Sequence, residues 1–292
     1  MSAGFVDRQQ VGRRFSRVAA SYGEGDFFAR EIDSRMLERL DYVNLQPKRV
    51  VDLGCSRGGS FPALNARYPE AEWVGIDLSP AMLAAGRPPR AGWQRWLGLG
   101  RRGEPQRLAA DAANLPLSTR SAALVWSNLL LHWLDDPIPA LAEAYRVLEV
   151  GGLLMFSTLG PDTLKELRST FSDGYAHTQR FADMHDLGDM LVGCGFADPV
   201  MDMEIVTLTY DDLDALFADL RAAGSMCAMK ARRHGLTGRQ AWAAARAAYE
   251  SLRCDGKLPA TFEVIYGHAW KAAPKQTPDG RAIVRFDLPR KG

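Results

Sequence analysis

The stretch of sequence that decides the fold reads Val51-Asp-Leu-Gly-Cys-Ser-Arg-Gly-Gly59. A short apolar run delivers an acid and is followed at once by glycines, which let a backbone approach a ligand closely. The next apolar run ends with Asp77 and Leu78. An acid at that place can accept hydrogen bonds from the hydroxyls of a ribose. Together the two runs predict a strand–turn–helix unit that could hold a nucleoside, although the glycines alone could equally form a tight turn without a ligand.

Strand-like and helix-like segments alternate around this unit. Strands are expected at 49–54, 72–78, 107–110, 122–129 and 152–159, and then at 200–210 and 261–270. Helices are expected at 60–68, from Ser79-Pro80 onward and at about 137–148. Because short connections join these segments, the pattern predicts an α/β fold with a doubly wound, mostly parallel, seven-stranded sheet covered on both faces.

The remaining segments suggest how the chain is organised. Residues 1–45 read as an N-terminal helical segment, with helices at 7–22 and 26–43. The main domain then spans 46–271, with a helical insertion at about 160–198, after the fifth strand, and further helices within 211–253. The insertion is expected to cap the substrate. The tail 272–292 is expected to be loosely held, apart from a strand-like run at 282–286.

Composition narrows the class of protein. The chain has 292 residues, of which 47% are hydrophobic and 24% charged, as in ordinary globular proteins. A formal charge of +1 argues against a general nucleic-acid binder. No apolar run reaches the length of a membrane span. The four cysteines lack the spacing of a metal site or disulfide framework, which favours a reducing, cytoplasmic compartment and predicts no metal.

Charge is unevenly sorted along the chain. Seven acids and no Lys or Arg lie between Asp198 and Asp219, whereas eight bases and two acids lie between Arg221 and Lys257. Six arginines lie between Arg87 and Arg107, opposed only by Glu104. Such runs are either solvated faces or a docking face for an acidic partner.

The charges expected at the nucleoside site distinguish a phosphorylated ligand from a cationic one. A nicotinamide dinucleotide would favour Gly-x-Gly-x-x-Gly, with a helix N-terminus under its pyrophosphate, and that spacing is absent. Asp52 would repel a pyrophosphate and favour a cation. S-adenosylmethionine carries a ribose, an ammonium and a sulfonium and no phosphate, so it fits these signs.

Further polar residues follow the next strands. Asp111 ends the third strand-like run and suits the amino group of an adenine, while Ser127 ends the fourth. The carboxyl ends of strands are where open α/β sheets bind ligands. The candidate cofactor-binding residues are therefore Asp52, Gly54, Ser56, Gly58, Asp77, Leu78, Asp111, Ala112 and Ser127.

With these residues in place, the stretch 49–159 resembles a class I S-adenosylmethionine-dependent methyltransferase. The family motif is acid-x-Gly-x-Gly-x-Gly, and here Ser56 replaces the middle glycine. The resemblance implies that Asp52 and Gly54 hold the methionine end of the cofactor. It also implies that Asp77 binds the ribose and that Asp111 and Ala112 bind the adenine.

Longer motifs within residues 7–271 indicate a particular family of these methyltransferases. The motifs are Phe15–Tyr22, Leu131–Trp133, Phe156–Leu164, Arg180-Phe181 and Thr261–Trp270. They are similar to segments of the malonyl-acyl-carrier-protein O-methyltransferases of biotin synthesis. Segments 160–168 and 258–266 also resemble a mitochondrial complex I assembly factor that is thought to hydroxylate an arginine. The alternatives are therefore a related enzyme acting on another acid or on a protein arginine, and a non-catalytic assembly factor that binds the cofactor.

The resemblance implies methylation of the free carboxylate of a malonyl thioester, carried by acyl carrier protein or coenzyme A. That carboxylate is already ionised at pH 7, so no general base is required. An arginine is expected to orient it through its fork of donors. Arg180 is the first candidate and Arg168 the second, although each could be a surface residue.

Three further roles are expected. Tyr22 could cap the cofactor pocket from the N-terminal helix or simply pack there. His132 is a candidate catalytic base, although a lone histidine after a buried strand is more often structural. The basic segment Arg221–Lys257 would dock the acidic carrier protein, guided by long-range attraction.

Overall fold

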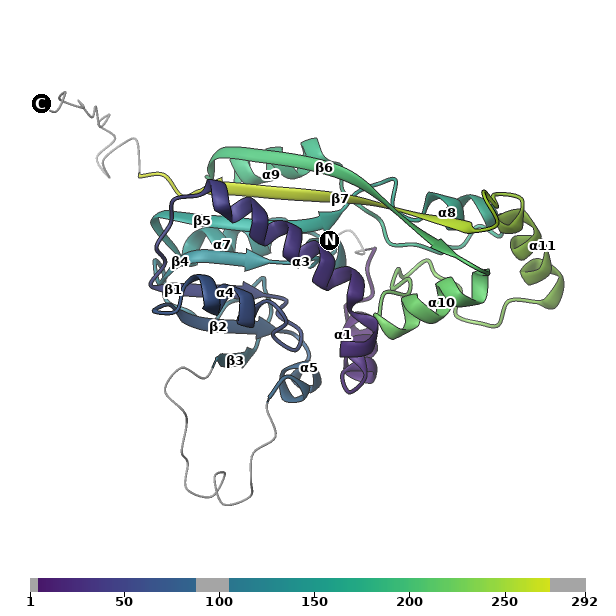
Figure 1. Cartoon of the computed structure of the whole chain (residues 1–292), viewed down its shortest axis with the longest axis horizontal. Helices are drawn as coiled ribbons and strands as arrows, with labels where there is room; N and C mark the ends of the chain where they lie inside the picture. The colour runs from purple at the N-terminus through teal and green to yellow at the C-terminus, as the bar shows by residue number, and fades with distance from the viewer. Residues whose placement is uncertain (1–4, 88–104, 274–292) are drawn as a thin grey trace, which may run out of the picture.

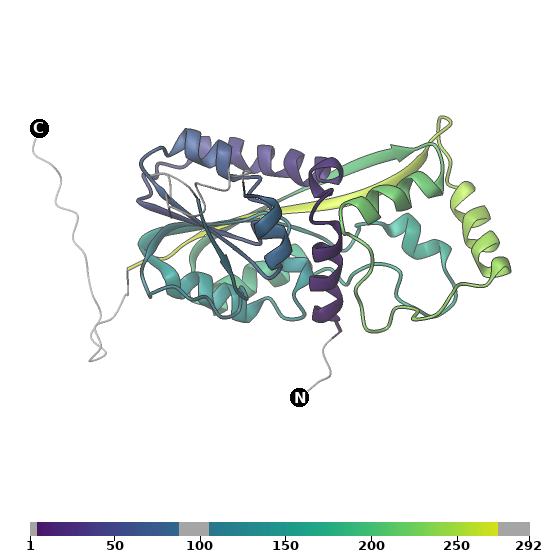
Figure 2. The same cartoon turned by 90° about the horizontal axis from the view of Figure 1, so that it is seen from below.

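A computed structural model describes residues 5–87 and 105–273. Most of the arginine-rich segment 87–107, and nearly all of the tail 272–292, lie outside this part of the chain. Within it, a central sheet runs through the molecule, with helices above and below it (Figures 1 and 2).

The sheet has seven strands in the order β3-β2-β1-β4-β5-β7-β6. The strands β1 to β5 pair in parallel, whereas β7 is antiparallel to both of its neighbours. This arrangement confirms the predicted doubly wound, mostly parallel sheet. The strand bounds are β1 Arg49–Leu53, β2 Glu72–Asp77, β3 Gln106–Ala109, β4 Ala122–Ser127, β5 Leu148–Leu159, β6 Ala197–Tyr210 and β7 Leu258–Trp270.

Four of the helices in the described residues, α1, α5, α9 and α10, begin at a side-chain cap. The Ser79 hydroxyl accepts a hydrogen bond from the Met82 amide before α5, and Pro80 occupies the first helical position. Asp212 likewise caps α10 through the Ala215 amide. The bounds are α1 Arg8–Val18, α2 Tyr22–Gly25, α3 Phe27–Arg39, η1 Leu40–Tyr42, α4 Phe61–Arg67, α5 Pro80–Ala85, η2 Leu131–Trp133, α7 Ile138–Val147, α8 Lys165–Thr170, α9 Met184–Gly193, α10 Leu213–Ala222 and α11 Arg239–Glu250.

Two apolar cores cover the two faces of the sheet. Neighbouring residues of β4 point to opposite faces, so that Leu124 and Trp126 pack in one core and Val125 in the other. Helices α3 and α4 cover the first face, and α7 and α9 cover the second (Figure 2). Burial on both faces explains why the strands read as continuous apolar runs rather than as alternating ones.

Strands β6 and β7 are long, and they carry helical segments beyond the end of the sheet. Helices α8, α10 and α11 lie at that far end (Figure 1). By contrast, α9 packs on the sheet beside α7, through Leu187 and Leu191. The expected cap at 160–198 is thus divided: only its first part, up to Phe181, contributes to the cavity described below. None of the helices in 5–87 and 105–273 is long and apolar enough to cross a membrane.

Candidate active site

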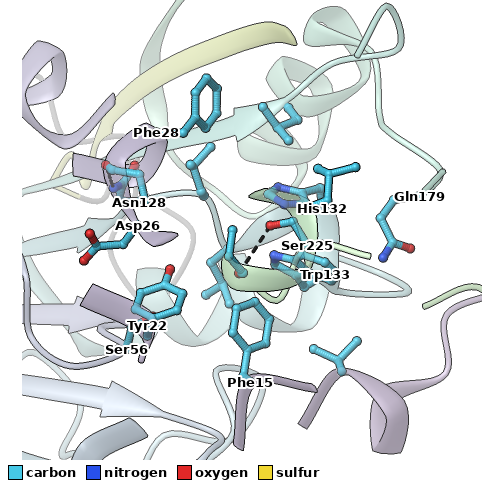
Figure 3. Close-up of a pocket in the computed structure, with 18 of the residues that line it drawn as sticks. Phe15, Tyr22, Asp26, Phe28, Ser56, Asn128, His132, Trp133, Gln179 and Ser225 are labelled. Atoms are coloured by element: carbon cyan, nitrogen blue, oxygen red, sulfur yellow. Dashed lines mark hydrogen bonds between the residues drawn. The ribbon is translucent and has the colours of Figure 1, made fainter. Parts of the chain in front are cut away.

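A cavity of about 240 Å³ opens at the carboxyl ends of the parallel strands. Its walls come from the glycine turn after β1, the ends of β2 and β3, helix α1 and the segment between α10 and α11 (Figure 3). This is the edge at which open α/β sheets bind ligands. The sequence had placed the nucleoside site at the same edge.

The turn after β1 alternates in backbone conformation. Gly54, Ser56 and Gly58 have φ of +72°, +50° and +83°. A left-handed conformation costs a non-glycine residue roughly 1–2 kcal/mol. At Ser56 the cost is offset in part, because its amide donates a 2.9 Å hydrogen bond to the Asp77 carboxylate. Ser56 therefore holds a left-handed conformation between two glycines that also have positive φ.

The floor of the cavity is acidic. Asp52 is 1% exposed, and its Oδ2 atom has no hydrogen-bond partner. Burial, together with the neighbouring charges of Asp33 and Asp77, raises the pKa of Asp52 well above its usual value. A buried polar atom without a partner costs roughly 1–3 kcal/mol. A cationic ligand that donates a hydrogen bond to Asp52 would remove this cost.

Asp77 is held in position by the backbone around it. Its Oδ1 accepts from the Ser79 amide at 2.7 Å, and its Oδ2 accepts from the Ser56 amide. Burial is the largest cause of its raised pKa. Leu78 follows at the cavity wall and is 44% exposed. A fixed carboxylate beside an open apolar wall suits a ribose and its attached base.

The predicted adenine end is covered by the N-terminal helix. The carboxylate of Asp111 forms an ion pair with Arg8 of α1 and accepts a 3.0 Å hydrogen bond from the Ala113 amide. Ala112 is buried beside it and also lines the cavity. The Arg8 side chain is 56% exposed, so this ion pair is weak and exchangeable.

Aromatic rings form a wall between the two halves of the cavity. The centre of the Phe15 ring lies 6.3 Å from that of Tyr22 and 5.2 Å from that of Trp133, and both pairs are edge to face. The centres of the His132 and Trp133 rings are 5.1 Å apart. Burial raises the pKa of Tyr22 to about 12, so its hydroxyl stays protonated. The Phe15 and Tyr22 rings lie close to Ser56 of the glycine turn, and Trp133 and His132 lie beyond them (Figure 3).

His132 is a poor base in this setting. Its Nδ1 lies 3.3 Å from the Thr158 hydroxyl, and the residue is 8% exposed. Burial lowers its pKa to about 3, so the ring is neutral at pH 7. It lines the cavity, but its geometry favours the structural reading over a proton-transfer role.

The structure brings some of the predicted residues to the cavity and leaves others outside it. Arg180 is exposed, with its guanidinium 4.8 Å from the centre of the Phe5 ring, and Arg168 is exposed and donates to the Pro161 carbonyl at 2.7 Å. Ser127 donates its hydroxyl to the Leu53 carbonyl at 3.2 Å. None of these three side chains lines the cavity, and neither does Gly58. The position expected for a carboxylate-orienting arginine is therefore not filled by Arg180 or Arg168.

Two polar residues that line the cavity, Asp33 and Asn128, were not predicted from the sequence. Asp33 accepts from the Ser60 hydroxyl at 2.7 Å and from Trp126 Nε1 at 2.9 Å. Asn128 donates to the Ala29 carbonyl at 2.8 Å and follows Ser127 directly. Only Asp33 had a usable signal, because an acid lies next to Ile32 on the apolar face of its helix. In the described ranges, no group of three or more possible metal ligands comes together.

The donor set fits S-adenosylmethionine. Asp52 offers an unpartnered oxygen to an ammonium, Asp77 is oriented for a ribose, and the acidic floor suits a sulfonium. The buried Asp52 carboxylate at this end of the cavity would repel a pyrophosphate. The residues that would hold the group are those of the glycine turn, with Asp52, Asp77 and Asp111.

Comparisons with known proteins agree with this assignment. Residues 51–156 match the family model described as a methyltransferase domain. A putative methyltransferase from Bacillus halodurans superposes with a TM-score of 0.57 at 15% identity, covering 82% of this chain and 99% of that one. The YcgJ protein of Bacillus subtilis gives 0.56 at 14% identity, covering 84% and 99%. The fold and the site therefore define a class I methyltransferase that uses S-adenosylmethionine.

Sequence relatives of the same length are more specific. This chain is 47% identical to the malonyl-[acyl-carrier protein] O-methyltransferase of Gallionella capsiferriformans, over 98% of both chains. It is 48% identical to the protein of the same name from Laribacter hongkongensis, over 97% of both. The chain belongs to the malonyl-[acyl-carrier protein] O-methyltransferase family.

Proposed function

We propose that this protein transfers the methyl group of S-adenosylmethionine to the free carboxylate of a malonyl thioester, giving the methyl ester that enters biotin synthesis. The observation that carries the proposal is identity over nearly the whole chain with proteins of that name. The cavity supports it, because its acidic floor suits the methyl donor and its lining continues past His132 and Trp133 to Gln179 (Figure 3). We also propose a cytoplasmic location, the compartment that the sparse cysteines predict.

The reaction requires the methyl donor and the acceptor carboxylate to be aligned, and it requires no proton transfer. The bound donor supplies a methyl group on a sulfonium, which is a reactive electrophile. The acceptor carboxylate is ionised at pH 7, since ordinary carboxyls titrate near pH 4. Holding the two reactants in line can contribute roughly 7–11 kcal/mol in favourable systems. Neutral His132 is therefore not required to take a proton.

The residues of this chain divide the task. Asp52 and Asp77 fix the donor, and the Tyr22 and Phe15 rings close the cavity from the N-terminal side. Excluding water strengthens the attraction between carboxylate and sulfonium. The product ester carries no charge at that end, so enzymes that extend uncharged chains can accept it.

The carrier-docking face is narrower than the segment Arg221–Lys257. At the α10–α11 end, Arg246 pairs with Asp214 at 2.6 Å and Lys257 pairs with Asp211. The acids of the preceding segment therefore neutralise much of its positive charge. An acidic partner would find little net charge there.

Three basic residues, Arg180, Lys230 and Arg233, lie where three segments meet, and of these Arg233 also pairs with Asp173 at 3.5 Å. We define the carrier face as Phe5, Tyr175, Arg180, Lys230 and Arg233. The Lys230 amide donates to the Phe5 carbonyl at 2.8 Å, Arg180 covers the Phe5 ring, and Arg233 lies 5.2 Å from the Tyr175 ring centre. The rings are about half exposed, at 51% and 48%. An acidic carrier with some apolar surface fits this combination.

The experiment is methyl transfer from labelled S-adenosylmethionine to malonyl-carrier protein, scored as a base-labile ester. We expect label with the malonyl carrier and none with acetyl carrier, which has no free carboxylate. Absence of label from the malonyl carrier would reject the proposal. Label on a protein arginine, or tight donor binding without any transfer, would instead indicate one of the alternatives considered above.

A further inference from the structure

Gln179 is a buried side chain whose hydrogen bonding is incomplete. It is 7% exposed and lines the cavity. Its Oε1 atom is buried without a hydrogen-bond partner. Its Nε2 atom is 3.5 Å from the Met226 carbonyl oxygen, at the outer limit of a hydrogen bond. Buried polar groups in native proteins nearly always find partners, so this one points to a ligand.

The position of Gln179 separates it from the methyl donor. In Figure 3 it lies across the cavity from Tyr22 and Ser56, with His132 and Trp133 between them. The glycine turn, where the donor would bind, is on the Tyr22 side. A group on the acceptor that meets Gln179 therefore lies some distance from the reacting carboxylate.

The chain passes from the cavity to the surface at this point. Thr178 and Gln179 are both 7% exposed, whereas Arg180 is exposed and belongs to the carrier face. An acyl arm that entered beside Arg180 would reach Gln179 before it reached the aromatic wall. Met226 and Phe181 also line the cavity and give it apolar walls there.

The chemistry of the amide selects the kind of group. A glutamine amide offers an acceptor and a donor side by side, which match the N–H and C=O of a secondary amide. The unpartnered Oε1 calls for a donor on the ligand, and a carboxylate has none. The thiol Sγ of Cys227 already donates to the Thr178 and Ala176 carbonyls, at 3.3 and 3.4 Å, and is less available.

We propose that Gln179 binds a secondary amide in the pantetheine arm that carries the malonyl thioester. The inference rests on the proposed function. Carrier protein and coenzyme A share this arm, so either could present it. Gln179 would then recognise the arm, and the methyl-transfer centre would recognise the malonyl group.

The test compares substrates with and without amides. Gln179→Met keeps the size of the side chain and removes its polar atoms. We expect kcat/KM to fall about tenfold with malonyl-carrier protein and malonyl-coenzyme A. No fall is expected with a malonyl thioester of a simple alkyl thiol. Affinity for S-adenosylhomocysteine should not change, and Tm should not fall, because the variant removes an unsatisfied buried group.

Controls separate the possible outcomes. Gln240→Met, an exposed substitution on α11, should change none of these quantities. Equal losses with all three thioesters, or a loss with the carrier protein alone, would overturn the assignment to the shared arm. A wild-type protein without activity on any thioester would instead reject the proposed function. The ratio of wild-type kcat/KM values for the carrier protein and coenzyme A identifies the natural source of the arm.

Discussion

The carboxylate of Glu263 lies where a side chain at position 160 would begin. A Cβ built on Gly160 would overlap the Glu263 carboxyl group. That carboxylate accepts a 2.7 Å hydrogen bond from the Asp162 amide, and the Gly160 amide donates to the Glu263 carbonyl at 2.9 Å. The two longest family-like motifs thus meet face to face and fix the start of the cap.

This contact predicts that Gly160→Ala is harmful. Because the neighbouring atoms are a buried carboxyl rather than a flexible tip, we expect unfolding free energy to fall by about 1–3 kcal/mol. Methyl transfer should also fall, since the cap begins at this turn. Urea unfolding and a methyl-transfer assay check this. Gly235→Ala, where a Cβ meets nothing within 4 Å, should be nearly neutral, and equal behaviour of the two variants would contradict the prediction.

The buried Asp52 predicts a pH-dependent stability in the absence of ligand. Burial raises its pKa in the folded state. The folded state therefore holds a proton that the unfolded state releases above about pH 4, and stability falls as pH rises through the folded-state pKa. We expect Asp52→Asn to flatten this fall, as measured by urea unfolding from pH 4 to 8. The variant should also lose stabilisation by S-adenosylhomocysteine; full stabilisation would contradict the role of Asp52.

The state of His132 predicts a simple pH–rate profile. Because its pKa is lowered to about 3, its ring does not change charge near neutrality. We expect kcat to show no inflection at about pH 6.5, where an ordinary histidine titrates. Single-turnover rates between about pH 5.5 and 8 provide the measurement. An inflection near 6.5 that disappears in His132→Asn would restore the histidine as a base.

Tyr22 acts through its ring more than through its hydroxyl. We expect Tyr22→Phe to weaken binding of the methyl donor by no more than about tenfold, the value of one hydrogen bond. Tyr22→Ala opens the aromatic wall beside Phe15 and should reduce kcat more strongly. Calorimetry with S-adenosylhomocysteine and steady-state kinetics separate the two effects. Equal losses in both variants would give the hydroxyl the main role.

The carrier face predicts a local charge effect. Arg180→Glu combined with Lys230→Glu should raise KM for malonyl-carrier protein at low salt, and added salt should reduce the difference. KM for a malonyl alkyl thioester should stay unchanged. Arg239→Glu reverses a single positive charge at the start of α11, at the far end of the molecule, and should have little effect (Figure 1). An effect of Arg239→Glu equal to that of the double variant would return docking to the broader segment.

The order of strands and helices could be predicted because each segment carries its own signal. The apolar runs before Asp52, Asp77 and Asp111 became β1, β2 and β3, each within a residue or two of the predicted bounds. The place of β7 between β5 and β6 had no such signal. It depends on pairing between residues about a hundred positions apart, as between Leu159 and Val264.

The acceptor side was harder to predict for a related reason. The family-like pair Arg180-Phe181 pointed to the correct stretch of chain, but the direction of each side chain depends on its tertiary contacts. The backbone there turns Gln179 inward and Arg180 outward onto Phe5. The place of Asp33 beside Ile32 on the apolar face of its helix could have signalled burial, but its partners, Ser60 and Trp126, lie far along the sequence and could not be predicted.

After an irregularity near Ala197, strands β6 and β7 pair without a break from Val200 and His268 to Tyr210 and Leu258, well past their neighbours in the sheet. Beyond the other strands they form a two-stranded ribbon, and helices α8, α10 and α11 lie at its end (Figure 1). Asp52 and Asp77, which would hold the methyl donor, lie instead on the parallel strands β1 and β2. The helices at the end of this ribbon could therefore be exchanged for others, which would change the acceptor that is bound, while the residues for the nucleoside on β1 and β2 stay in place.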